Sequence, residues 1–402
     1  MPGKPSPSST VSVRISRRGV ERLKSGHVWV YRSDVVSADG VPPGALVAVA
    51  DERGKLLGSA LYSTASQIAI RMLSREPVSD FPALLRQRIA DALAYRERLH
   101  LLGADSDTDA CRLIFSEADF LPGLIVDRYN DLLSFQVLTQ AMDAEPVRQT
   151  LLAEFTQKIN PAAIAERADA RVRDLEQLPP RTSGLVQGEK GSTIVTMNGV
   201  KFHYDALEGQ KTGAFLDQRE NYAAAARYAR GQALDVFCYH GGFALHLAPH
   251  CASVTGVDSS RPALEVADRN AALNSREVEW IEANAFDLLR DYAASGRQYD
   301  LIVLDPPAFA KTRKNLETAL RGYKELNLRA LKMLRPGGIL VTCSCSYHVS
   351  QAEFLEVVAD AARDSHRNLR LLEIRTQAKD HPILPDVPET AYLKCLIAHV
   401  SN

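Results

Sequence analysis

The sequence predicts an α/β protein whose C-terminal half holds a mostly parallel sheet, preceded by a small β-barrel and an α+β middle domain. Three observations lead to this fold class. From Gly231 onward, strand-like apolar runs alternate with helical periodicity, which favours a parallel sheet covered on both faces. Short apolar runs with Gly and Pro turns fill the first 75 residues, which is typical of a small barrel. Between these regions lie one long amphipathic helix and a β-meander.

The length and composition agree with a soluble globular protein of several domains. The chain has 402 residues, which predicts two or three domains, and it is 46% hydrophobic and 24% charged. No apolar run is long enough to span a membrane. The segment Met1–Thr10 lacks the apolar core of a signal peptide, so we expect a short flexible tail and a cytoplasmic location.

The cysteines and the charges narrow the possible partners. Six cysteines occur without CxxC pairs, so neither a disulfide framework nor a zinc site is expected, and no metal is assigned. Residues 1–76 hold eleven Lys and Arg against six Asp and Glu, whereas the whole chain has a net charge of −1. This asymmetry favours an N-terminal module that meets phosphates, although a solvated basic face without a partner has the same signature.

The N-terminal region, residues 1–75, is expected to form the barrel. Turn signals at Val41–Gly44 and Asp51–Gly54 separate its apolar runs. The expected strands are Val11–Ile15, Val28–Tyr31, Leu46–Ala50, Leu56–Leu61 and Gln67–Met72.

The middle region, residues 76–185, is expected to be a small α+β domain. Phe81–Leu102 has helical spacing of apolar residues, and the meander that follows turns at Leu121–Gly123 and Tyr129–Asp131. A helix over Glu145–Lys158 and a strand over Ala162–Arg167 complete it. Beyond this domain, Asn198-Gly199 between two alternating runs is a strong signal for a two-residue hairpin.

The C-terminal region, residues 186–402, contains the alternating elements. Two final runs, LRLLEIR and YLKCLIAHV, are expected to close the sheet as an antiparallel pair. The parallel strands are expected at Ala233–Phe237, Ser253–Val257, Glu277–Glu282, Leu301–Leu304 and Ile339–Cys343. The helices are expected at Phe243–Pro249, Arg261–Asn274, Asn284–Asp291, Leu316–Leu334 and Glu353–Asp364.

Candidate functional residues follow these strands, because an α/β sheet binds ligands at the carboxyl ends of its strands. The loop after the first strand contains Gly241-Gly242, which allows close backbone approach, but the GxGxxG spacing of dinucleotide enzymes is missing. Asp258 after the second strand could accept hydrogen bonds from ribose hydroxyls, or it could cap a helix, a role that Ser259 or Ser260 could also fill. Asn284 after the third strand could meet adenine or act as an N-cap.

The fourth strand ends in Asp305-Pro306-Pro307-Ala308-Phe309. The two prolines stiffen this loop and could hold a planar base against a rigid wall. Ahead of the sheet, the segment GQKTGAFLDQREN gathers Lys211, Asp217, Gln218 and Arg219 beside Phe215. Its density of polar groups favours a lid over a cofactor or substrate, although an ordinary helix start is the alternative.

The fifth strand ends in Thr342-Cys343-Ser344-Cys345-Ser346, and this stretch predicts a particular chemistry. Carbon 5 of cytosine is a poor nucleophile, so its methylation requires a thiolate to add first at carbon 6. Cys343 is expected on the strand and Cys345 in the loop, which favours Cys345 as nucleophile and a buried apolar role for Cys343. Asp305 is the candidate acid near N3 of the base.

Two parts of the sequence resemble known protein families. The runs RRGVERLKSGHVWVYRSDV and PPGALVAVADERGKLLGSALYS resemble a PUA domain, a small RNA-binding barrel. The motifs DVFCYHGGF, VDSS, NAF, DPPAF and TCSCS, with TGAFLDQREN ahead of them, resemble the RlmI-like family over nearly the whole chain. Its members are S-adenosylmethionine-dependent 5-methylcytosine methyltransferases of large-subunit (23S) ribosomal RNA.

The resemblance implies a class I methyltransferase fold with a seven-stranded Rossmann-like sheet and an antiparallel terminal strand. It also implies S-adenosylmethionine as cofactor and Cys345 as nucleophile. It implies cofactor contacts at Asp235, Phe237, Gly241, Asp258, Asn284 and Asp305, and the neighbouring motif positions Gln218, Cys238, Ser259 and Ala285 complete the expected cofactor set. The expected RNA-contacting set is Arg17, Arg18, Arg22, Lys24, Lys211, Pro306, Pro307 and Phe309.

One departure from related RNA cytosine methyltransferases concerns product release. Many of them place a cysteine after the proline of the strand-four motif, where this chain has Pro307 and Ala308. The base that removes the carbon 5 proton is therefore unassigned, with Cys343 or a bound water as candidates.

Competing interpretations are a guanine-N7 methyltransferase of the same fold, which needs no cysteine, a small-molecule methyltransferase, and a non-catalytic RNA-binding assembly factor. The expected partner is ribosomal RNA, naked or partly assembled, with the target base extruded into the site. A homodimer is compatible with the sequence.

Overall fold

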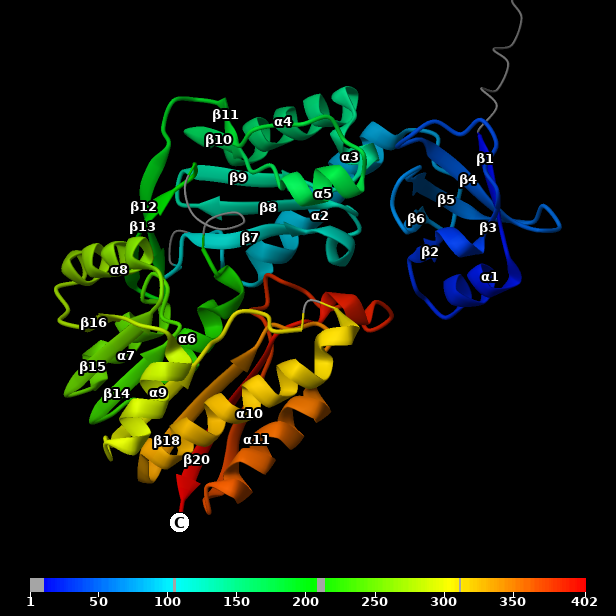
Figure 1. Cartoon of the computed structure of the whole chain (residues 1–402). Coiled ribbons are helices and arrows are strands. Elements are labelled where there is room, and N and C mark those ends of the chain that lie inside the picture. The colour runs from blue at the N-terminus through cyan, green and yellow to red at the C-terminus, as the bar shows by residue number, and fades with distance from the viewer. Residues whose placement is uncertain (1–10, 104–105, 208–213, 311) are drawn as a thin grey trace, which may run out of the picture. The chain divides into compact units, whose positions relative to one another are not determined.

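A computed structural model of the chain describes residues 11–103, 106–207, 214–310 and 312–402 (Figure 1). The expected N-terminal tail and Lys211 lie outside these residues. Contacts between residues divide the chain into two compact units. Unit 1 comprises Met1–Thr193, Tyr204–Ala214 and Asp380–Thr390, and unit 2 comprises Ile194–His203, Phe215–Lys379 and Ala391–Asn402. Among the described helices, none combines the length and apolar character needed to cross a membrane.

The first sheet of unit 1 is six-stranded, in the order β2-β6-β5-β4-β1-β3. Its inward residues, among them Val13, Val30 and Ile70, form one buried apolar cluster. All five expected strands are present within two residues of their expected ends, and the structure adds a sixth, Val35–Ser37, that the sequence did not predict. They are β1 (Ser12–Ile15), β2 (Trp29–Tyr31), β3 (Val35–Ser37), β4 (Leu46–Asp51), β5 (Leu56–Tyr62) and β6 (Ile68–Ser74).

The helix α1 (Arg17–Lys24), which the sequence pattern did not predict, lies between the first two strands. Its sequence is strongly polar, so it lacks the wide apolar stripe that identifies most helices. Ser16 caps it by accepting a hydrogen bond from the Gly19 backbone N–H at 3.3 Å. Gly19 is buried, and a Cβ there would lie 3.3 Å from both Ile15 and Val30, so the helix packs closely on the barrel.

The second sheet of unit 1 is five-stranded, in the order β11-β10-β9-β8-β7. Leu61 and Leu73 of the first sheet belong to the same buried cluster as the helices and strands around this second sheet, so the two sheets share a core. Its strands are β7 (Ala110–Phe115), β8 (Leu124–Tyr129), β9 (Leu132–Val137), β10 (Ala163–Glu166) and β11 (Gly184–Gln187). Its helices are α2 (Phe81–Arg98), α3 (Gln140–Asp143), α4 (Glu145–Ile159) and α5 (Ala170–Leu175).

The predicted hairpin is confirmed as the strands β12 (Ser192–Met197) and β13 (Val200–Asp205). Its two turn residues, Asn198 and Gly199, have φ values of 49° and 79°. Left-handed conformations at both central positions are those of a tight two-residue turn, which explains why Asn-Gly specifies it.

The sheet of unit 2 is seven-stranded, in the order β16-β15-β14-β17-β18-β20-β19. The first five strands in this order pair in parallel, and β20 pairs antiparallel with both β18 and β19. The expected Rossmann-like class I methyltransferase sheet is thus confirmed. The strands are β14 (Gln232–Val236), β15 (Ser253–Asp258), β16 (Glu279–Glu282), β17 (Tyr299–Leu304), β18 (Leu334–Ser344), β19 (Asn368–Arg375) and β20 (Lys394–Ser401).

Helices cover both faces of this sheet, as the alternating pattern predicted. On one face α9, α10 and α11 pack over Leu234, Ile302 and Leu340, and Figure 1 shows α10 and α11 running side by side. On the other face α6 and α7 pack over Val303 and Cys343. The helices of this unit are α6 (Arg219–Ala226), α7 (Gly242–Leu247), α8 (Arg261–Leu273), α9 (Ala285–Ala294), α10 (Leu316–Met333) and α11 (Gln351–Asp364).

Candidate active site

The loop after β14 has an unusual backbone. Phe237 and Tyr239 have φ values of 69° and 48°, and Gly241 has a φ of 84°. Left-handed conformations are costly for residues other than glycine, and they persist where the surrounding structure over-determines them. A Cβ on Gly241 would lie 2.9 Å from the Trp280 ring, so no side chain fits there and the loop presents its backbone. The predicted need for glycine in this loop therefore has a steric basis.

Asp235 lies beneath this loop and is fully buried. One carboxylate oxygen accepts a hydrogen bond from the Ala244 backbone N–H at 2.9 Å, and the other has no partner among the described residues. Burial raises the pKa of Asp235 to about 8. The side chain holds the first turn of α7 in place, and a direct cofactor contact for Asp235 stays a prediction. Cys238 is also buried in this loop.

Asp258 ends β15 and shapes the adjacent turns. It accepts hydrogen bonds from the Tyr239 backbone N–H at 3.0 Å and from the Ser260 N–H at 2.9 Å. Ser260, not Asp258, caps α8, since its side chain accepts from Ala263 N–H. Asp258 therefore joins the loops after β14 and β15, and Ser259 is exposed beside it.

Asn284 serves as the N-cap of α9, which is the structural role that the sequence left open. Its Oδ1 atom accepts hydrogen bonds from Phe286 N–H at 2.9 Å and from Asp287 N–H at 3.3 Å. Ala285 is the first residue of this helix and is buried, whereas Phe286 is exposed. Cofactor contacts for Asn284 and Ala285 stay predictions.

Two carboxyl groups lie where the loop after β17, which begins with Asp305, meets the turn before α6. The Gln218 amide donates to an Asp305 carboxylate oxygen at 2.9 Å. Burial, assisted by the nearby Asp217 carboxylate, raises the pKa of Asp305 to about 7. Asp217 accepts a hydrogen bond from the Tyr392 hydroxyl at 2.6 Å, and its second oxygen is buried without a partner among the described residues. Two carboxyl groups therefore lie close together at this corner.

The expected cofactor fits this corner by its chemistry. S-adenosylmethionine carries a sulfonium and an ammonium group, and a buried carboxylate oxygen without a partner is stabilised by a cation. The residues that would hold the cofactor are Asp217, Gln218 and Asp305, together with the backbone of the Phe237–Gly241 loop. The sequence placed Asp217 in the lid segment but did not assign it to the cofactor.

Two buried serines and one tyrosine fix the loop after β18. The Tyr323 hydroxyl of α10 lies 3.0 Å from Ser344 Oγ and 2.9 Å from Ser346 Oγ. Ser346 Oγ also accepts from the Ala310 backbone N–H at 3.1 Å, which joins this loop to the strand-four motif. Cys345 lies between the two serines, is half-buried, and places its Sγ 3.8 Å from the Pro306 carbonyl oxygen.

Cys343, two residues earlier, has a different environment. It is fully buried among residues of α6 and α7 and lies directly across from Cys395 of β20. Burial raises the pKa of the Cys343 thiol well above its usual value. Its thiol is therefore poorly suited to act as a base or nucleophile, which agrees with the apolar role expected for it.

The loop after β17 exposes one of its two prolines and carries one aromatic ring. Pro306 is buried and Pro307 is exposed. The Phe309 ring lies 6.0 Å from the Phe286 ring and 4.8 Å from the Tyr323 ring, measured between centroids. Aromatic surface of this kind suits the stacking of a planar base.

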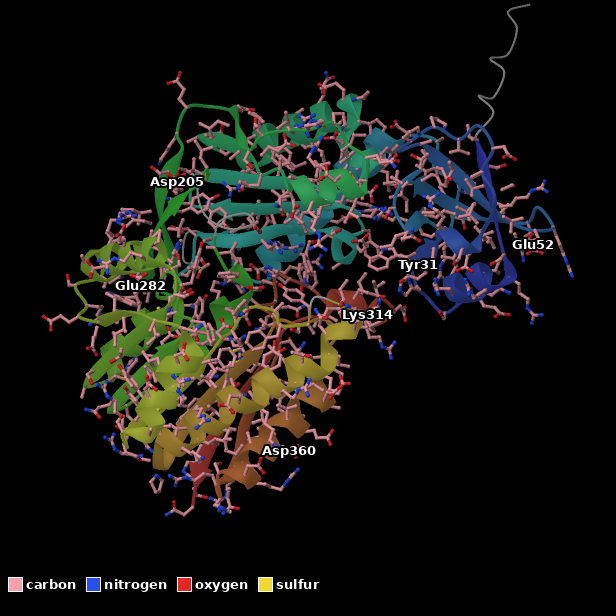
Figure 2. The ribbon with its side chains drawn as sticks, viewed as in Figure 1. Tyr31, Glu52, Asp205, Glu282, Lys314 and Asp360 are labelled. Atoms are coloured by element: carbon pink, nitrogen blue, oxygen red, sulfur yellow. The ribbon has the colours of Figure 1, made fainter. Side chains whose placement is uncertain are left out.

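The basic residues expected to contact RNA are carried by α1 in unit 1. Arg18 pairs with the buried Asp34 at 2.5 Å, and Arg22 lies 3.5 Å from the same carboxylate. The Arg22 guanidinium also stacks 4.4 Å from the centre of the Tyr31 ring, which Figure 2 labels on the barrel. Arg17 pairs with Glu21 but remains 91% exposed, and Lys24 is exposed. Arg22 therefore has a structural role, while Arg17 and Lys24 are the more accessible cations.

A hollow elsewhere in unit 2 contains none of the predicted functional residues. It measures about 770 Å³ and lies at the amino-terminal ends of the strands, where Ser253, Glu279 and Arg335 line it. Among the described residues, no group of His, Cys, Asp and Glu side chains could hold a metal ion.

Comparisons with known proteins agree with this geometry. Residues 13–75 match a family model for a PUA-like domain, and residues 120–399 match one for S-adenosylmethionine-dependent methyltransferases. A protein of Shewanella denitrificans named "Ribosomal RNA large subunit methyltransferase I" is 40% identical over 97% of this chain and 100% of its own length. The protein of the same name from Tolumonas auensis is 40% identical over 97% of this chain and 99% of its own length.

Solved structures resemble the chain in fold. A candidate S-adenosylmethionine-dependent methyltransferase from Streptococcus mutans has a TM-score of 0.81 at 18% identity, over 97% of this chain and 100% of that one. The structure of SMU.776 with bound SAH has a TM-score of 0.83 at 18% identity, over the same shares of both chains. At this level of identity the likeness shows a common fold.

Proposed function

Because the chain belongs to the family of S-adenosylmethionine-dependent ribosomal RNA large subunit methyltransferases, we propose that it methylates carbon 5 of one cytosine in 23S ribosomal RNA through a covalent adduct with Cys345. The position of the Cys345 thiol carries this proposal. It is half-buried at the carboxyl edge of the sheet, and its Sγ lies 3.8 Å from the Pro306 carbonyl oxygen of the strand-four loop. A guanine-N7 methyltransferase would have no use for a thiol at this place.

Cys345 performs the first bond-forming step. Its thiolate adds to carbon 6 of the cytosine, and the electron pair of the C5–C6 double bond moves toward the ring carbonyl and N3. Asp305 donates its proton to N3, a role for which its pKa of about 7 is suited near neutral pH. Carbon 5 then has enamine character. S-adenosylmethionine, when bound, supplies the electrophilic methyl group.

Release of the product reverses the addition. N3 returns its proton to Asp305, the proton on carbon 5 leaves to a base, the electron pair re-forms the C5–C6 double bond, and the Cys345 sulfur departs as a thiolate. Cys343 is fully buried and its burial raises the pKa of its thiol, so we assign the base to a water molecule at the site rather than to that thiol. Pro306, Pro307 and Phe309 would hold the extruded base flat beside Cys345.

Recognition of RNA would fall to the N-terminal region. We propose that residues 1–75 act as the RNA-binding PUA-like module, that 76–185 form the middle domain, and that 186–402 form the catalytic domain. Arg17 and Lys24 would meet phosphates directly, and Arg18, Arg22 and Lys211 complete the proposed contact set. Naked or partly assembled 23S RNA would be the substrate, because a specific unpaired base must be reached.

The decisive experiment incubates the protein with radiolabelled S-adenosylmethionine and unmodified 23S RNA and then identifies the modified nucleoside. We expect 5-methylcytidine with the wild type and with Cys343→Ala, and none with Cys345→Ala. A methylated guanosine as product, or full activity of Cys345→Ala, would contradict the proposal.

A second experiment tests the covalent step itself. RNA carrying 5-fluorocytidine cannot lose a proton from carbon 5, so the adduct should accumulate as a cross-link that survives denaturation. The cross-link should form with the wild type and with Cys343→Ala and should be absent with Cys345→Ala.

A further inference from the structure

Lys394 begins β20 and is buried next to the loop that carries Cys345. The antiparallel register places it directly opposite Ser344, the last residue of β18. Its ammonium group donates to the Ser346 carbonyl at 2.6 Å and to the Tyr392 carbonyl at 2.8 Å. Only 7% of this residue is exposed. A lysine so buried is unusual and costs free energy unless nearby groups compensate it.

Two groups near Lys394 offset the cost of burying its ammonium group. Burial lowers the pKa of Lys394 to about 8, while the Cys345 thiolate and the Glu353 carboxylate act in the opposite direction. Glu353 also completes the capping box of α11 by accepting from the Ser350 backbone N–H at 2.7 Å, and Lys394 contributes to lowering its pKa. The attraction between Lys394 and Cys345 is mutual, so the ammonium favours the thiolate form of the cysteine.

Two further groups lie near Cys345. The Pro306 carbonyl presents a negative dipole to the sulfur, and the Tyr323 hydroxyl of α10 has a raised pKa, mainly because of burial and to a lesser extent because of Cys345. Arg313 acts on Glu353 from the segment before α10. A nearby cation stabilises the thiolate form of a cysteine, and Lys394 supplies one beside this loop.

We propose that Lys394 is a positioning residue for the proposed nucleophile: it fixes the loop after β18 through the Ser346 carbonyl and stabilises the thiolate form of Cys345. The role in catalysis rests on the proposed function, since it requires Cys345 to attack the base. The effect on the thiol does not, because it is a property of the protein without RNA.

The test measures the rate at which iodoacetamide alkylates Cys345 in the full-length protein between pH 5.5 and 10, with the modified peptide identified by mass spectrometry. Replacing Lys394 with methionine keeps the length of the side chain and removes its charge. We expect Lys394→Met to move the midpoint of the pH profile upward by about one unit and to slow alkylation at pH 7 about tenfold. Lys394→Arg, which keeps the charge, should have a midpoint close to that of the wild type.

Thermal unfolding and S-adenosylmethionine binding by calorimetry serve as controls for folding. If Lys394→Met does not fold, Lys394→Gln retains a hydrogen-bond donor for the loop while removing the charge, and it should give the same upward shift. A wild-type midpoint in a folded neutral variant would overturn the proposal. The result is independent of the product analysis: if the wild type made a methylated guanosine, the proposed function would fail while the thiol assay would still report on Lys394.

Discussion

The helix α1 of unit 1 and the strand-end loops of unit 2 both gather polar side chains, but they do so in opposite ways. On α1 the charges stand on the surface, where Arg17 is 91% exposed and Arg18 is 66% exposed. In the strand-end loops, Asp217, Ser344, Ser346 and Lys394 are all buried and bonded to specific atoms.

This difference sets how each region should respond to mutation. Exposed charges act through screened, nearly additive electrostatics, so removing one of them changes binding gradually. Buried polar groups share hydrogen bonds in one network, so removing one leaves others without partners. We therefore expect large, specific losses from substitutions in the loops and small, salt-dependent ones from substitutions on α1.

The largest loss of activity should come from a substitution of Asp305. Asp305→Asn keeps an oxygen that can accept from Gln218, but it cannot pass a proton to the base. We expect kcat for RNA methylation to fall about 10²- to 10³-fold, as is usual when a general acid is lost. The variant should remain folded, with an unfolding temperature no lower than that of the wild type, because Asn has no buried charge to form. An activity within about threefold of the wild type would mean that the strand-four carboxyl is not the acid.

Tyr323 tests whether the loop network behaves as a unit. Tyr323→Phe removes the hydroxyl that lies between Ser344 and Ser346. We expect about tenfold lower kcat and a loss of about 1–2 kcal/mol in the free energy of unfolding, because buried serine hydroxyls lose a partner. Denaturant titration and steady-state kinetics measure the two effects. Tyr292→Phe, which removes a hydroxyl outside the loop network, serves as the control and should leave kcat unchanged.

The burial of Asp235 should make the stability of the protein depend on pH. The pKa of Asp235 is about 8 in the folded protein, against about 3.9 in the unfolded chain, so the folded state binds the extra proton between these values. Stability in the absence of cofactor should therefore fall as the pH rises through this window.

Asp235→Asn keeps the acceptor for Ala244 N–H and has nothing to ionise. Relative to the wild type, its unfolding temperature should be higher by roughly 5–10 °C at pH 8 than at pH 5. Calorimetry at the two pH values measures this. Parallel pH dependence in both proteins would show that Asp235 titrates normally.

The smallest effect is expected on α1. Arg17→Glu with Lys24→Glu should weaken 23S RNA binding about three- to tenfold and lower the dependence of log affinity on log salt by about two. Filter binding at several salt concentrations measures both quantities. A complete loss of RNA binding would contradict the expectation that substitutions on α1 have smaller effects than substitutions in the strand-end loops. Arg22→Glu is not an equivalent variant, because Arg22 contacts Asp34 and stacks on Tyr31, so it should also lower stability.

Local sequence patterns were enough to predict most of the fold and part of the site. The strand–helix alternation predicted the order of the unit 2 elements, and the motif Thr342–Ser346 placed Cys345 in a loop beyond its strand. These predictions depend on residues close together in the chain. The helix α1 was missed because its few apolar residues form no broad stripe.

Contacts between residues far apart in the chain could not be predicted from such local patterns. Lys394 follows Cys345 by almost fifty residues, and only the register between β18 and β20 brings the two together. The clue in the sequence was a lysine at the start of an otherwise apolar strand run, and a search for charged residues within buried strands would have found it. Asp217 stood in a recognised segment, but its importance depends on an unpartnered oxygen that only coordinates reveal.

The order of strands in unit 2 has a consequence for synthesis. The strand β20 follows both β18 and β19 in the sequence but is inserted between them, so these two cannot join the same sheet until β20 has left the ribosome. The same strand delivers Lys394 to the loop of Cys345. The Cys345 loop therefore acquires its buried cation only when β20 joins the sheet, and a nascent chain that has not yet released β20 lacks this contact.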